Sequence, residues 1–335
     1  MIVDGMPVYD SLVGRWFSAL EQRFDPVVDA AVRANFRALP QGYARTMESV
    51  LREHYYRPQD GFLDSVNGRQ DLAEHVDGRL RESRELIMPW LTSFTALSGR
   101  RVIEIGSGSG SSTAALAEQG ALITGIDLSE GASRCARTRL DLLGLSAELR
   151  LANAATDLAA LAAAPADLII FYASLEHMTH AERLGGLSSA WQALAAGGWL
   201  VVVEAPNRLW HTDLHSSHLP FFDWLPHELA LAYASHSPRP EYASALGPDA
   251  GERMQTLLRL GRGVSFHEFD LALGAVDVLR SSSLAEHRSQ RNALRRMRQR
   301  WSRDGRYSRL LQRRCGRPLP SGFFAPYLNL ALQKP

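Results

Sequence analysis

A loop of alternating glycine and serine residues is the part of the sequence whose spacing most clearly indicates chemistry. The apolar segment Arg101–Ile105 runs directly into the loop 106–110, and an alanine-rich helical pattern follows over Ser111–Glu118. Glycine permits positive φ angles and lets a ligand approach the backbone without meeting a Cβ atom. The start of the following helix would present unpaired N–H groups to a carboxylate or phosphate. The loop therefore predicts a binding site for a nucleoside that carries an anionic group.

Two acidic residues and one serine narrow the choice of nucleoside. Asp127 ends the second predicted strand, 21 residues after Gly106, which is the separation at which an acid meets a ribose diol. Ser111 stands where the dinucleotide-binding pattern has glycine or alanine. The acid Glu104, two residues before the loop, suits a ligand with an ammonium group better than one with a pyrophosphate. An ammonium-bearing nucleoside is therefore favoured over a nicotinamide dinucleotide, and a site without a nucleoside is the remaining alternative.

The pattern Glu-x-Gly-x-Gly-x-Gly over residues 104–110 resembles motif I of the class I S-adenosylmethionine-dependent methyltransferases. The resemblance continues over residues 100–205, through the segments Asp167–Ile170, Leu175–His177 and Gly197–Val201. The resemblance implies a doubly wound fold with S-adenosylmethionine as the cofactor. The sequence differs from the family at Asn153, where many members have an acid beside the adenine. The residues that we expect to bind the cofactor are Glu104, Gly106, Ser107, Gly108, Gly110, Asp127, Leu128, Asn153 and Ala154.

In such a fold the reacting groups would come from the ends of the fourth and fifth strands and from the N-terminal helices. Tyr172 offers an aromatic face to a sulfonium and a hydroxyl for hydrogen bonding, and His177 could accept a proton. Asn207 and His211 follow the fifth strand, beside several aromatic residues. We expect these four residues to be catalytic, and the segments 55–57 and 79–84 to be the ligand-facing parts of the cap.

Histidines are concentrated in one part of the chain, because seven of the eleven lie between residues 177 and 236. The spacing of His211, His215 and His218 would put three metal ligands on one helical face. Pro206 and Pro220 flank this segment, and no helical pattern runs through it. We therefore expect no metal site.

The segment 206–226 resembles a subgroup of bacterial methyltransferases that have a Pro-Asn-Arg element and a Trp-Leu-Pro. The cofactor site and the helical cap that would shield a small pocket favour methyl transfer to oxygen or nitrogen of a small molecule, as in specialised metabolism. Azetidine-2-carboxylate synthases also resemble class I methyltransferases, so S-adenosylmethionine itself could be the substrate, cyclising with release of methylthioadenosine. Methylation of RNA or protein is a third hypothesis, and a catalytically inactive partner protein that binds S-adenosylmethionine is the last.

Strands alternating with helices must position these residues. The apolar runs predict strands, and the three- and four-residue spacings predict helices. The predicted strands are Arg101–Ile105, Ala121–Ile126, Ala147–Leu151, Asp167–Phe171, Trp199–Val203, Val264–Leu271 and Tyr327–Leu332. The predicted helices are Val8–Phe24, Pro26–Leu39, Tyr43–Tyr55, Arg79–Phe94, Ser111–Glu118, Glu130–Leu143, Ala181–Leu194 and Pro226–Ser235. We therefore predict an α/β fold with a doubly wound, mostly parallel, Rossmann-like sheet and an N-terminal helical cap.

The predicted domains are a helical cap or lid over residues 1–98 and a cofactor-binding domain over 99–335. The second contains an aromatic and histidine-rich insert at 206–262 and an arginine-rich helical segment at 281–317, with twelve arginines against two acids. The net charge of +1 does not indicate nucleic acid as a partner. No apolar run is long enough for a membrane span, no secretory signal is visible, and two cysteines make no disulfide framework. We expect a cytoplasmic enzyme whose partner is a small molecule or the cofactor itself, and the sequence indicates no oligomeric state.

Overall fold

The computed structural model describes residues 30–57, 61–161, 164–247, 250–291, 297 and 301–335. A seven-stranded sheet in the order β3-β2-β1-β4-β5-β7-β6 forms its centre. The strands are β1 (Arg101–Ile105), β2 (Leu122–Asp127), β3 (Glu148–Leu151), β4 (Ala166–Tyr172), β5 (Leu194–Pro206), β6 (Ser281–Ser283) and β7 (Tyr327–Gln333). The pairs among β1 to β5 are parallel, and β7 is antiparallel to both of its neighbours. The predicted doubly wound, mostly parallel sheet is confirmed.

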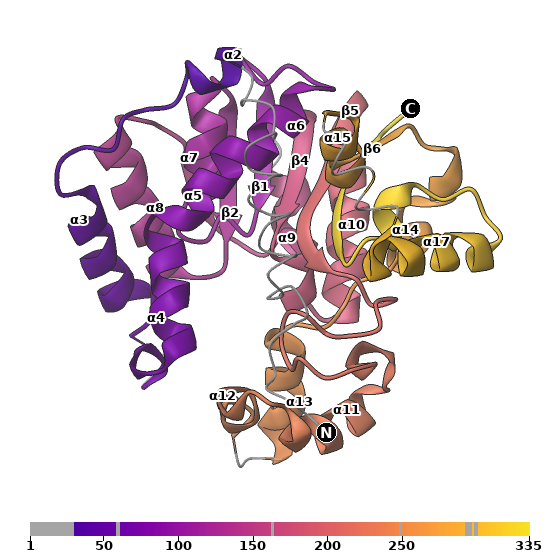
Figure 1. Cartoon of the computed structure of the whole chain (residues 1–335). Coiled ribbons are helices and arrows are strands. Elements are labelled where there is room, and N and C mark those ends of the chain that lie inside the picture. The colour runs from indigo at the N-terminus through magenta and orange to yellow at the C-terminus, as the bar shows by residue number, and fades with distance from the viewer. Residues whose placement is uncertain (1–29, 58–60, 162–163, 248–249, 292–296, 298–300) are drawn as a thin grey trace.

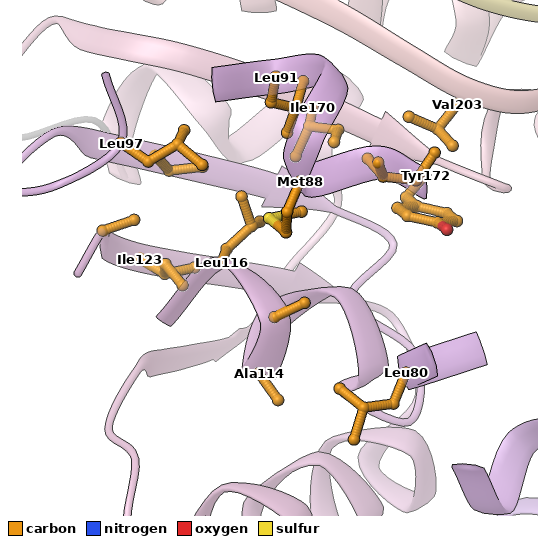
Figure 2. Packing of buried hydrophobic residues seen from close by; sticks show 14 of the residues in the cluster. Leu80, Met88, Leu91, Leu97, Ala114, Leu116, Ile123, Ile170, Tyr172 and Val203 are labelled. Carbon is orange, nitrogen blue, oxygen red and sulfur yellow. The ribbon is translucent and has the colours of Figure 1, made fainter. Parts of the chain in front are cut away.

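Two hydrophobic layers cover the sheet, because successive side chains of a strand point to opposite faces. On one face, Val102 and Ile170 pack with the N-terminal helices and with helices α7 (Ser111–Glu118) and α8 (Glu130–Leu143). Figure 2 shows Met88 and Leu91 beside Leu116 and Ile170 in this layer. On the other face, Ile103 packs with helices α9 (Ala154–Leu161), α10 (His180–Ala193) and α14 (Phe266–Leu273).

The N-terminal region is helical where the structure describes it. Its helices are α2 (Ala30–Arg33), α3 (Tyr43–Val50), α4 (Val66–Ala73), α5 (Arg79–Glu82) and α6 (Met88–Thr92), with π-helical turns at Leu51–Tyr55, Glu74–Gly78 and Ser83–Ile87. The predicted helix Val8–Phe24 and the first residues of Pro26–Leu39 lie outside the described residues. Helix α4 was not among the predicted elements. Together these helices share one hydrophobic core with the sheet.

The insert after β5 has a small core of its own. Helices α11 (His227–Tyr233), α12 (Pro240–Ala245) and α13 (Ala250–Arg259) belong to it, and its buried residues include Leu219, Phe222, Tyr242 and Leu257. In Figure 1 these helices lie at the lower end of the molecule, across from α4. The side chain of Asn67 on α4 donates to Glu241 on α12 over 2.5 Å, so the cap and the insert touch here.

One predicted strand is wrong. The segment Val264–Leu271 contains the beginning of helix α14 instead, because a capping box at Ser265 and Glu268 starts a helix there. Phe266 and Phe269, three residues apart, then form the buried face of that helix. The sheet is extended instead by β6, a three-serine strand that has no apolar signal, and by β7, which was predicted. The described part of the segment 281–317 is helical after β6, in α15 (Leu284–Arg291) and α17 (Arg303–Cys315).

Candidate active site at the carboxyl edge of the sheet

The glycine loop connects β1 to α7 by two turns that only glycine can make without strain. Gly106 has φ 82°, and a Cβ atom there would lie 2.6 Å from Cβ of Ser174. Gly110 has φ 78°, and a Cβ atom there would lie 2.7 Å from Cα of Ala136 on α8. The first glycine therefore brings the loop against the end of β4, and the second lets α7 and α8 pack closely.

Asp127 is held against the glycine loop at the end of β2. Its Oδ2 accepts a hydrogen bond from the backbone N–H of Gly108 over 2.8 Å, and its Oδ1 accepts one from Ser129 over 2.8 Å. Each carboxylate oxygen keeps further acceptor capacity for a ribose hydroxyl. Leu128 follows with 63% of its surface exposed and offers an apolar face beside the carboxylate.

Asn153 begins helix α9 and faces the same space. Its Oδ1 accepts a hydrogen bond from the backbone N–H of Ala155 over 2.9 Å. This oxygen keeps a second lone pair that could receive the amino group of an adenine, and the amide nitrogen is a donor that fits a ring nitrogen.

A cavity of about 1000 Å³ joins these residues to the cap and to the insert. Its walls come from the cap (Tyr55, His75, Arg79 and Ser83), the glycine loop, the ends of β2 and β4, and the insert (Leu214, His215, His218, Arg239 and Arg259). Nine of the predicted site residues line it, namely Gly106, Ser107, Gly108, Asp127, Leu128, Asn153, Ala154, Tyr172 and His177. The other four, Glu104, Gly110, Asn207 and His211, are outside its lining.

Glu104 lies behind the loop instead of facing a ligand. It is fully buried and accepts hydrogen bonds from the hydroxyls of Ser112 and Thr113. Burial raises the pKa of this carboxyl from 4.5 to about 7, although the two hydroxyls lower it. Glu104 thus orients the first turn of α7, where Ser111 lines the cavity and its buried hydroxyl has no hydrogen-bond partner among the described residues.

Replacing Glu104 by glutamine is expected to change how stability depends on pH. A carboxyl whose pKa is raised in the folded state stabilises the protein most at pH values below its unfolded-state pKa, which is near 4.5. This contribution to stability is lost as the pH rises towards the folded-state pKa of about 7. The glutamine carries no charge and can still accept a hydrogen bond. The melting temperature of E104Q relative to the wild type should therefore increase between about pH 5 and pH 8. A difference that stays constant over this range would contradict the burial of an ionisable group at this position.

Asn207 and His211 hold the backbone of the insert and do not reach the cavity. The amide nitrogen of Asn207 donates to the carbonyls of Phe323 and Ala325 over 2.8 and 2.7 Å, and its Oδ1 accepts from Leu209 over 2.9 Å. His211 stacks on Trp210 and hydrogen bonds to its neighbour Thr212. We therefore do not carry the catalytic roles predicted for these two residues into the proposed mechanism.

Tyr172 lies between the cap and β5. Its hydroxyl is 3.2 Å from the Ser83 hydroxyl and 3.4 Å from the carboxylate of Glu204. Burial raises the pKa of Tyr172 well above its ordinary value, so the phenol stays neutral. Arg79 forms a long ion pair of 3.5 Å with Glu204, and its Nε has no hydrogen-bond partner among the described residues. Arg79 therefore brings a weakly paired positive charge to the cavity wall.

Glu176, His177 and His215 form a cluster at the insert side of the cavity. The ring centroids of the two histidines are 5.2 Å apart, and Nε2 of His177 is 3.8 Å from Oε1 of Glu176. Burial lowers the pKa of His177 and lowers that of His215 to about 4, so both imidazoles are neutral near pH 7. The same effect raises the pKa of the Glu176 carboxyl to about 7. The sequence placed His215 with His211 and His218, whereas the structure places it with residues nearly forty positions earlier.

The residues around the loop fit S-adenosylmethionine on the chemistry of their donors and acceptors. The unpartnered Ser111 hydroxyl and Arg79 suit a carboxylate, Asp127 suits a ribose diol, and Leu128 suits the face of an adenine. Among the helices that the structure describes, none is long and apolar enough to cross a bilayer.

Comparisons with known proteins agree with this site. Residues 102–198 match the family described as "Methyltransferase domain". The ubiquinone biosynthesis O-methyltransferase of Thiobacillus denitrificans is 31% identical over 121 residues, which are 36% of this chain and 51% of that protein. The corresponding protein of Azoarcus sp. (strain BH72) is 34% identical over 103 residues, 31% of this chain and 44% of that protein. The chain thus matches about half the length of these curated relatives.

Among solved structures, one similar chain is the magnesium protoporphyrin IX methyltransferase from Synechocystis PCC 6803 with bound SAH, which is 22% identical. The match covers 50% of this chain and 72% of that chain, with a TM-score of 0.36. The glycine loop, Asp127 and the parallel strands all lie within or beside the family match at 102–198. Residues 102–198 thus match the methyltransferase domain, and the glycine-loop site in this segment fits S-adenosylmethionine as its cofactor.

Proposed function

We propose that this protein transfers a methyl group from S-adenosylmethionine to an oxygen atom of a small molecule bound in the capped cavity. One observation carries the proposal. The glycine loop, Asp127 and two neighbouring histidines, His177 and His215, line one cavity of about 1000 Å³, and Glu176 lies buried beside these histidines. Curated relatives that share about half their length with this chain are O-methyltransferases, which favours oxygen as the methyl acceptor.

The cofactor would occupy the loop side of the cavity and supply an electrophilic methyl group on its sulfonium. Asp127 would hold the ribose, Leu128 and Asn153 the adenine, and Ser111 and Arg79 the methionyl carboxylate. Tyr172, buried and neutral, offers its ring to the positive charge, an interaction of about 2 kcal/mol in a desolvated site. These residues chiefly bind and orient, and orientation alone can supply about 7–11 kcal/mol of the barrier to transfer.

The size of the cavity favours a separate acceptor over a reaction of the cofactor alone. Sites for small ligands occupy roughly 300–1,000 Å³, and this cavity reaches the upper end of that range. The histidine cluster marks the acceptor side. His177 is neutral, 42% of its side chain is exposed, and its Nδ1 is engaged, so its Nε2 can take up a proton from a hydroxyl.

The cap and the insert would exclude water from the reaction. Tyr55, His75 and Arg79 line the cavity from the cap, and Arg239 and Arg259 line it from the insert. These walls enclose a space suited to a small molecule. The lining residues run from 55 to 259, so the arginine-rich helices α15 and α17 belong to another part of the surface and do not favour a nucleic-acid acceptor.

The reaction can be identified by mass spectrometry of the products. Purified protein would be incubated with S-adenosylmethionine alone and with a panel of phenols and other hydroxylated small molecules. S-adenosylhomocysteine together with a methylated acceptor is the expected result. Methylthioadenosine and azetidine-2-carboxylate from S-adenosylmethionine alone would replace the proposal with intramolecular cyclisation, for which the sequence also left room.

Changing His177 to glutamine is expected to lower kcat by about 100-fold, at the lower end of what proton transfer contributes. The glutamine amide can still donate to the carbonyl of Arg259, as Nδ1 of His177 does over 2.8 Å, so the fold should be kept. The Kd for S-adenosylmethionine should change by no more than about twofold, because the cofactor occupies the other side of the cavity. Steady-state kinetics and calorimetry measure the two effects. Loss of cofactor affinity with kcat intact would place His177 on the wrong side of the cavity.

A further inference from the structure

The cluster of Glu176, His177 and His215 has the composition and spacing of a metal site. One ligand atom from each residue lies within 4.8 Å of the other two. Two imidazoles and a carboxylate are ligands that first-row divalent cations such as Zn²⁺ prefer, at bond lengths of about 2.0–2.2 Å.

Glu176 gives the second, independent sign of a missing ligand. Its side chain is completely buried, and neither carboxylate oxygen has a hydrogen-bond partner among the described residues. A buried carboxylate without partners is costly, and such groups are normally paired or bound to a metal. Both oxygens are therefore available to a cation beside His177.

The orientation of His177 is the one that a metal ligand needs. Its Nδ1 is 2.8 Å from the carbonyl of Arg259 and must be the protonated nitrogen, because a carbonyl can only accept. The lone pair of Nε2 is then directed to the side of Glu176. Metal-bound histidines almost always use their other nitrogen in this way. Arg259 is itself fixed by two hydrogen bonds to the carboxylate of Glu182.

His215 is held in place by its backbone. The carboxylate of Asp213 accepts hydrogen bonds from the N–H groups of His215 and Ser216 over 2.9 Å each, and Arg239 donates to the carbonyl of His215 over 3.1 Å. A buried arginine, Arg183, donates to the carbonyl of Glu176 over 3.0 Å. Both halves of the cluster are thus built on rigid backbone, although they come from distant parts of the chain.

We propose that Glu176, His177 and His215 bind one first-row divalent cation, with its remaining coordination positions open to the cavity. Arg79 and Arg183 are cationic neighbours of the cluster, and the carboxylates of Glu204 and Glu268 partly offset their charge. With the cation bound, Nε2 of His177 is a ligand and no longer a proton acceptor. An acceptor hydroxyl on the cation loses its proton to solvent because the cation lowers its pKa. This role at the acceptor side rests on the proposed function, whereas metal binding itself does not.

The test measures metal binding by the full chain without S-adenosylmethionine. Metal-free protein, prepared with a chelator, would be titrated with Zn²⁺ in a calorimeter and with Co²⁺ while the visible absorption of the bound ion is recorded. We expect one ion per chain. Losing a residue that only hydrogen bonds to a metal ligand typically weakens metal binding by roughly 10–100-fold. E176Q and H215A each remove a ligand, so each should weaken binding by more than this and should change the Co²⁺ spectrum.

His236→Ala is the matched control, because His236 lies on the surface of the same insert and stacks on Tyr233. This variant should bind both ions as the wild type does. Circular dichroism and the melting temperature of each metal-free variant show whether it is folded. The proposal is overturned if the folded wild type takes up neither ion, or if E176Q and H215A bind with wild-type affinity and spectrum. Methyl transfer that persists in fully metal-free protein would remove the cation from the mechanism and leave the proposed function in place.

Discussion

Replacing Asp127 by asparagine is expected to weaken S-adenosylmethionine binding by at least about 100-fold. The carboxylate accepts hydrogen bonds from Gly108 and Ser129, and we propose that it also receives the ribose diol. A hydrogen bond to a charged group contributes about 1.5–3 kcal/mol, and two such bonds to the diol would be lost or weakened. An asparagine also presents an N–H group to the N–H of Gly108 or to the ribose, so the shape of the loop would be disturbed as well.

Calorimetric titration of the cofactor into wild type and variant measures this effect. Asp141→Asn is the control, because Asp141 is an exposed carboxylate on α8. This substitution removes the same charge from the protein without changing the loop. Its affinity for the cofactor should equal that of the wild type. Equal affinities in D127N and D141N would mean that the nucleoside binds elsewhere, and the assignment of β2 to the ribose would be wrong.

The cofactor half of the site could be predicted because local sequence determines it. Helices Ser111–Glu118 and Glu130–Leu143 have the predicted bounds. The second of them begins at the capping residue Ser129 and ends at Gly144, which has φ 62°. Such caps are short-range signals, and the strand–loop–helix unit that holds the cofactor spans few residues.

The acceptor half could not be predicted, because it depends on contacts between distant segments. Glu176 was visible only as part of a family-like segment, and nothing in the spacing of His215 indicated that it would lie beside Glu176. Its position follows from a loop without regular structure that Asp213 and Arg239 hold together. No helix forms at residues 211–218, as the flanking prolines indicated, and the spacing of these histidines gave no sign of the contact between His215 and His177.

The cap raised a similar difficulty. The sequence indicated that the segments 55–57 and 79–84 face the ligand, and Tyr55, Arg79 and Ser83 do line the cavity. The neighbouring Tyr56 instead donates its hydroxyl to Asp71 over 2.7 Å within the cap. Which of two adjacent aromatics points inward depends on the turn of the π-helical segment that ends at Tyr55, and periodicity alone does not predict such a turn.

One buried side chain connects the cap to the glycine loop. Arg139 on α8 is completely buried, and its guanidinium donates to the carbonyl of Ser109 in the glycine loop over 2.9 Å. The same group donates to the carbonyls of His75 and Val76 in the cap over 2.5 and 3.0 Å, and to the hydroxyl of Tyr43. Arg139 therefore ties the cap to the glycine loop by hydrogen bonds, in addition to the hydrophobic core that the cap shares with the sheet.

Arg139→Met is accordingly expected to lower the free energy of unfolding by about 3 kcal/mol. Three buried carbonyls lose their donor, at a cost of about 1–3 kcal/mol each. Part of this cost is offset because methionine, unlike arginine, has no charge to desolvate on burial. Cofactor affinity should also fall, by about tenfold, since Ser109 is no longer held. Urea denaturation and calorimetry measure the two quantities.

Arg134→Met is the control. Arg134 is an exposed arginine on the same helix and pairs only with Glu130 among its described contacts. Its replacement should change the free energy of unfolding by less than about 0.5 kcal/mol. If both variants lose the same stability, Arg139 does not hold the cap to the cofactor loop, and the other contacts of the cap are enough to position it.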